Sequence, residues 1–125
     1  MIPPEDGPAL VLAAGRLLLG GLFVLSGLRH LFIQPVLTDA LRERGVPRAR
    51  LVLLLATAFQ ISAGAFLALS LHVPSAALCL IAFTVTATIL MLNFWDMQGP
   101  ERQAAVQGWM TNAAIVGGLL LAAGG

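Results

Sequence analysis

Four long apolar segments constrain the fold of this sequence more than any other feature. Each approaches the roughly 20 mainly apolar residues with which a helix crosses a bilayer, and none alternates as a membrane β-strand does. The 125 residues are 58% hydrophobic and 10% charged, whereas soluble domains carry about a quarter charged residues. We therefore predict an all-α, integral membrane four-helix bundle that forms one domain over residues 1–125. The expected spans are residues 9–32, 51–71, 74–92 and 106–123.

The positions of the arginines predict the direction of these spans. Only a few residues around His72 separate the second span from the third, which predicts an antiparallel hairpin. Positive residues gather in the cytoplasmic connections of membrane proteins. We therefore expect a multi-pass protein of the bacterial inner membrane, with both termini on the outer, periplasmic side. The arginines of the first and third connections are Arg42, Arg44, Arg48, Arg50 and Arg102.

The first connection has the pattern of a short amphipathic helix. Pro35 is suited to opening a helix and Gly45 to closing one. We expect a short interfacial helix between the first and second spans; the alternative is a solvated loop whose arginines only set the topology. The expected apolar face carries Val36, Leu37, Ala40 and Leu41, and the opposite face carries Asp39, Arg42 and Glu43.

Polar residues within the spans are costly when unpaired, so their depths are informative. By helical rise, Arg16 lies about 10 Å and Gln60 about 16 Å below the outer edge. We expect Arg16 to have a structural role, either snorkelling to the outer surface or hydrogen-bonding within the bundle.

A second polar group lies at the cytoplasmic end of the spans. Arg29 and Asp96 are expected at matching depth, where they can pair. The group forms either a structural clamp between helix ends or the polar floor of a ligand pocket. The candidate ligand-binding residues are Arg29, His30, Asn93, Asp96, Asn112 and Gln60.

Several functional classes lack support in the sequence. His30 and His72 are expected at opposite membrane edges, so one chain does not bring them to one haem iron. The single Cys79 excludes an intramolecular disulfide. Metal-ligand spacing, nucleotide-binding motifs and a basic nucleic-acid footprint are absent. We expect no intrinsic cofactor, no metal and no nucleic acid, and we assign no catalytic residue.

Small residues give several spans flat surfaces. Membrane helices use such surfaces to approach one another closely. Alternatively, such a surface can accommodate the flat ring of a ligand. Those of the first and fourth spans also suggest a homo-oligomer. The residues are Gly20, Gly21, Gly27, Gly64, Ala68, Gly117 and Gly118.

The order of several segments resembles the DoxX family of small four-span bacterial membrane proteins. The segments are GRLLLGGLFVLSGLRHL, RERGVP, AFQISAGAFLAL, NFWDMQGPERQ and TNAAIVGGLLL. The resemblance implies association with membrane redox enzymes, since the family is named for a thiosulfate–quinone oxidoreductase. Many relatives carry an acidic residue in place of Gln60 and a histidine in place of Asn93, which weakens any proposal of proton transfer here.

Two functions follow as hypotheses. The first is a subunit associated with redox or quinone-linked enzymes, which binds a quinone or lipid between its helices beside a cytoplasmic or membrane redox protein. The alternative is a non-catalytic scaffold or assembly factor, in which Arg42, Arg44, Arg48 and Arg50 bind a cytoplasmic partner or anionic lipid. A small-solute transporter ranks last, because the chain has no inverted repeat and no interrupted helix.

Overall fold

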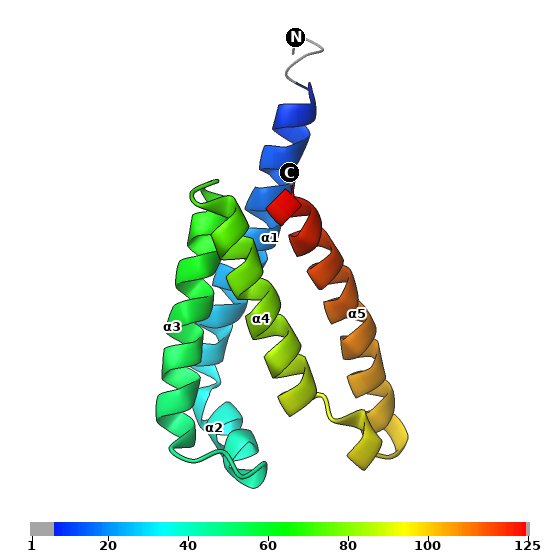
Figure 1. Ribbon diagram of the computed structural model, residues 1–125. Coiled ribbons are helices and arrows are strands. Elements are labelled where there is room, and N and C mark those ends of the chain that lie inside the picture. The colour runs from blue at the N-terminus through cyan, green and yellow to red at the C-terminus, as the bar shows by residue number, and fades with distance from the viewer. Residues whose placement is uncertain (1–6, 125) are drawn as a thin grey trace.

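The computed structural model describes residues 7–124 and consists of helices joined by short connections. Within this part, four helices are long and apolar enough to cross a membrane. The prediction of an all-α chain with four potential membrane spans is therefore confirmed. In chain order the elements are α1 (Gly7–Phe32), α2 (Gln34–Glu43), α3 (Ala49–Ala68), α4 (Val73–Met91), the 3-10 helix η2 (Phe94–Asp96) and α5 (Gly99–Gly124) (Figure 1).

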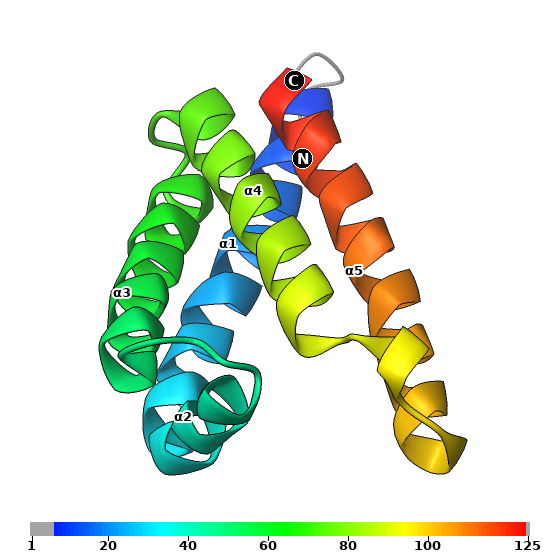
Figure 2. The same ribbon diagram turned by 60° about the horizontal axis from the view of Figure 1, so that its bottom comes forward.

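The long helices alternate in direction along the chain (Figure 1). The α3–α4 turn lies at the same end of the bundle as the start of α1 and the end of α5, whereas α2 and η2 lie at the other end (Figures 1 and 2). The most extensive contacts join α1 to α3 and α4 to α5. The first and third connections therefore lie at one end of the bundle and the second connection at the other, as four antiparallel spans require. Which side of the membrane each end faces stays a prediction.

The observed helix ends differ from the ends of the expected spans, because a helix terminates at a turn and not where the hydropathy falls. The helix α3 ends at Ala68 although the apolar run continues to Leu71. Ser70 takes a left-handed conformation (φ 57°), and the Leu71 N–H donates to the Phe66 carbonyl. Such a geometry closes helices by satisfying their last carbonyls. At the other boundary, α5 begins at Gly99, before the expected start of the fourth span at 106.

Glycines allow α1 and α3 to come into close contact. A Cβ atom added at Gly20 would overlap the carbonyl oxygen of Gly64 and the amide nitrogen of Ala68. One added at Gly64 would lie 2.9 Å from the Gly20 carbonyl oxygen. The predicted packing role of these residues is thus confirmed. Gly21 and Gly117 instead have open space around them, and the homo-oligomer inferred from such surfaces stays a prediction.

We predict that Gly20→Ala destabilises the protein, because the added methyl group meets backbone atoms that cannot move aside. Overpacking of this kind costs about 1–3 kcal/mol. Gly21→Ala is the matched control, and it should be neutral or stabilising because alanine favours helix. Thermal unfolding in detergent measures both variants. Equal melting temperatures for the two would contradict the close α1–α3 contact.

The predicted short helix between the first two spans is present as α2. Pro35 lies in its first turn, and Gly45 follows its end with φ 79°. Leu41 is buried with Ala49 and Leu53 of α3, and Leu37 packs against this cluster. The apolar face of α2 therefore closes one end of the bundle, although Val36 is exposed. Its location at the membrane surface stays a prediction.

Arg44 ties this connection to the end of α4. Its guanidinium donates to the carbonyl oxygens of Leu90 (3.1 Å), Met91 (3.2 Å) and Ala40 (3.1 Å). It also donates to Oδ1 of Asn93 at 3.2 Å. The last carbonyls of a helix lack intrahelical partners and carry partial negative charge. Arg44 satisfies them, so it has a structural role that the sequence interpretation did not foresee.

We expect Arg44→Gln to lower the free energy of unfolding by about 3 kcal/mol, since hydrogen bonds from a charged donor are lost. Arg42→Gln is the control, because the ion pair of Arg42 is with exposed Asp39 at 3.5 Å. A surface pair contributes about 1 kcal/mol or less. Denaturant titration of both variants tests this difference, and an equal loss in the two would argue against the Arg44 contacts.

Candidate functional site

A cavity of about 710 Å³ lies between the helices. Its wall is mainly apolar and includes Phe59 and Phe83, whose ring centroids lie 6.4 Å apart. The volume is within the range typical of small-molecule sites. A minority of the lining residues are polar, and they come from α1, α3, α4 and α5. These are Ser26, His30, Thr57, Gln60, Thr84, Thr86 and Asn112.

Gln60 is the most informative of these residues. Its side chain is only 2% exposed, and its Nε2 donates to the Phe23 carbonyl of α1 at 2.9 Å. Because that carbonyl can only accept, the amide orientation is assigned without ambiguity. Oε1 is consequently the other amide atom, and it is buried with no hydrogen-bond partner. An unsatisfied buried acceptor is rare and costly, and this one belongs to a residue that lines the cavity.

Two threonine hydroxyls accompany Gln60 on the cavity wall. Thr57 precedes Gln60 by one helical turn on α3, and Thr84 belongs to α4. Both residues are buried, at 2% and 5% exposure, and neither Oγ1 atom has a hydrogen-bond partner. The sequence interpretation missed Thr57. The signal was its spacing from Gln60, because residues three apart share a helix face.

The neighbouring polar residues are satisfied by the protein itself. The Thr88 hydroxyl donates to the Thr84 carbonyl at 2.6 Å, and Asn112 Nδ2 donates to Thr88 Oγ1 at 2.8 Å. Farther along the same interface, Trp109 Nε1 donates to the Leu92 carbonyl at 2.6 Å. These contacts attach α5 to α4, so Asn112 has a structural bond besides its position on the cavity wall.

The candidate residues predicted from the sequence divide among three places. His30, Gln60 and Asn112 line the cavity. Asn93 and Asp96 lie with Arg44 around a second recess of about 640 Å³. The remaining candidate, Arg29, is exposed on α1.

The expected ion pair between Arg29 and Asp96 does not form within residues 7–124. Asp96 instead accepts from Asn93 Nδ2 at 3.5 Å. Depth alone suggested the pair, but α1 ends beside α2, whereas η2 packs against α5 on the other side of the bundle (Figure 2). The polar residues that were expected together at one end of the spans therefore do not form one site.

The other singled-out residues lie away from the cavity. Arg16 is half-buried on α1, about two turns before the Phe23 carbonyl that Gln60 contacts. His72 lies at the α3–α4 turn, opposite the end that holds His30 (Figure 1). Among the described residues, no group of three or more His, Cys, Asp and Glu side chains is placed to hold a metal ion.

The family model of DoxX matches residues 11–93. The chain belongs to the DoxX family. The match includes nearly all of α1 and all of α2, α3 and α4, so it covers Thr57, Gln60 and Thr84 but not Asn112. With its four potential spans, this DoxX member is a multi-pass membrane protein. No match was found among curated proteins or among solved structures.

Proposed function

We propose that this DoxX family protein is an inner-membrane subunit associated with redox or quinone-linked enzymes, and that its cavity binds a quinone or a similar lipid-soluble ring. The observation that carries the proposal is the mainly apolar cavity of about 710 Å³ with a few polar residues on its wall. Apolar sites with a few oriented polar groups are typical of small-molecule recognition.

The wall of the cavity supports a lipid-soluble ligand in particular. Leu22, Val52 and Phe59 line the cavity and are large apolar residues that stay exposed. A ligand dissolved in the bilayer therefore has an apolar route to the site. The partner protein supplies the redox cofactor in this proposal.

Duroquinone, a tetramethylated benzoquinone without a tail, should raise the melting temperature of the purified protein by a few degrees at saturation. Ala56→Phe should abolish this shift, because Ala56 lines the cavity and the ring occupies its space. Ala58→Phe, two residues along the same helix and exposed, is the matched control. Absence of any shift in the unmodified protein, together with no quinone co-purifying from native membranes, would refute quinone binding.

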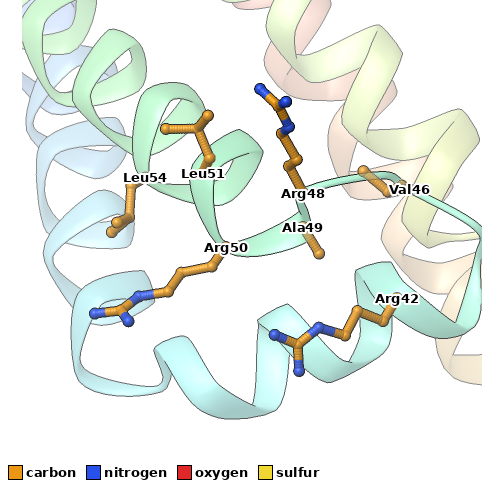
Figure 3. A pocket seen from close by; sticks show the side chains of 7 residues that line it. All are labelled: Arg42, Val46, Arg48, Ala49, Arg50, Leu51 and Leu54. Carbon is orange, nitrogen blue, oxygen red and sulfur yellow. The ribbon is translucent and has the colours of Figure 1, made fainter.

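A second candidate function, a scaffold for a cytoplasmic partner, draws support from the surface near α2. Arg42, Arg48 and Arg50 are exposed around a recess of about 430 Å³ (Figure 3). Arg48 and Arg50 make no side-chain hydrogen bond or ion pair within residues 7–124. Unlike Arg44, these three side chains are available to attract an acidic protein surface.

Replacing Arg42, Arg48 and Arg50 together by glutamine, with Arg44 retained, should abolish recovery of such a partner in a cross-linking pull-down. The matching triple lysine variant keeps the positive charge and the topology signal, so it should retain most of the recovery. Reporter fusions check the orientation of each variant. Full recovery with the triple glutamine variant in the correct orientation would exclude this function.

A further inference from the structure

Both tryptophans of the chain lie in one aromatic cluster, which consists of Phe94, Trp95 and Trp109, and the chain has no tyrosine. The ring centroid of Trp95 lies 5.5 Å from that of Phe94 and 6.3 Å from that of Trp109. Phe94 and Trp109 are 5.8 Å apart, and all three pairs meet edge to face, a favoured arrangement of aromatic rings. The aromatic cluster therefore joins η2 to the first half of α5.

The two tryptophans are held differently. Trp109 is half-buried, and its Nε1 donates to the Leu92 carbonyl at 2.6 Å, which fixes the cluster to the end of α4. Trp95 is 54% exposed, and its indole N–H has no hydrogen-bond partner within residues 7–124. Trp95 thus leaves both an apolar ring and an N–H donor exposed. Such a side chain suits a place where one part of it meets hydrocarbon and another meets polar groups.

The length of α4 places this cluster at the edge of the hydrocarbon. The 19 residues of α4 include no charged side chain from Val73 to Met91. At the rise of an α-helix they extend about 28 Å, close to the roughly 30 Å thickness of the hydrocarbon core. With Val73 at one edge, Met91 lies at the other. The cluster follows directly, and Asp96 is the first charged residue beyond it.

The helix α5 places the same edge independently. Its 26 residues extend about 39 Å, which exceeds the hydrocarbon thickness. No charged residue follows Trp109 as far as Gly124. The polar residues all precede Trp109 and are exposed: Glu101, Arg102, Gln103 and Gln107. The part of α5 that is compatible with hydrocarbon therefore begins at Trp109, beside the end of α4.

We propose that the aromatic cluster anchors this end of the bundle in the headgroup region of the bilayer, with Trp95 in contact with lipid. Indole rings gather at membrane–water interfaces for the reason given above. Arg102, whose guanidinium carbon lies 5.7 Å from the Phe94 ring centroid, supplies a cation for lipid phosphates. The anchor fixes the depth of Leu92, which bonds to Trp109 and also lines the cavity.

Quenching by brominated phospholipids tests the anchor on the unmodified protein, because its only two tryptophans belong to the cluster. The protein is reconstituted into phosphatidylcholine vesicles whose acyl chains carry bromine either near the headgroup or near the chain end. We expect the shallow bromine to quench tryptophan fluorescence roughly twofold more than the deep bromine, as for indoles at the interface. Bromine in both leaflets makes the result independent of orientation. Equal or stronger quenching by the deep bromine, or quenching by aqueous iodide alone, would overturn the proposal.

Single-tryptophan variants assign the result to Trp95. Trp109→Phe leaves Trp95 as the only reporter, and the stronger quenching by shallow bromine should persist. The reference is Val85→Trp in a protein with Trp95→Phe and Trp109→Phe, because Val85 is 43% exposed within α4. There the deep bromine should quench more strongly. A Trp95 signal that matches this reference, or that only iodide reaches, would overturn the contact with the interface. The experiment on the unmodified protein decides the proposal if Trp109→Phe does not fold.

Discussion

The close contact between α1 and α3 is the interaction on which the candidate site depends. Between membrane helices there is no hydrophobic driving force, so they associate through van der Waals packing and a few hydrogen bonds. Gly20 and Gly64 remove the side chains that would separate the two backbones. At the same interface, the Gln60 amide reaches the Phe23 carbonyl across the helix pair. Packing and hydrogen bonding therefore reinforce each other, and together they orient Gln60.

The pattern of satisfied and unsatisfied polar groups separates structural residues from candidate ligand-binding residues. Thr88 and Asn112 complete a chain of hydrogen bonds that attaches α5 to α4. Gln60 Oε1 and the hydroxyls of Thr57 and Thr84 are buried but have no partners. In an apolar cavity such groups are costly when left unsatisfied. The residues that carry them line the cavity, which is why they are candidate residues of a ligand site.

Arginines that are close in sequence have different roles, because their guanidinium groups lie in different surroundings. Arg44 satisfies carbonyls at the end of α4 and joins α2 to that helix. Arg42, Arg48 and Arg50 extend from the surface around a shallow recess (Figure 3). A count of positive charges in this connection treats all four alike, whereas only three are available to a partner.

The sequence by itself determined the properties that depend on a single helix, such as its place in the chain and its hydropathy. Hydropathy located the four potential spans, and Pro35 and Gly45 placed the short helix α2 close to its observed bounds. Depth also singled out Gln60 as a polar residue near the midplane, and small residues correctly indicated the packing surface at Gly20 and Gly64.

The tertiary structure alone decided which of these groups meet. Depth cannot reveal rotation about a helix axis or the lateral order of helices, so it suggested an Arg29–Asp96 pair that does not form within residues 7–124. The same limitation concealed the role of Arg44, whose guanidinium bonds to Leu90 and Met91 of α4, 46 and 47 residues later in the chain. Which amide atom of Gln60 bonds to α1 follows only from its contact with Phe23. These outcomes depend on side-chain packing between helices, which no property of a single span specifies.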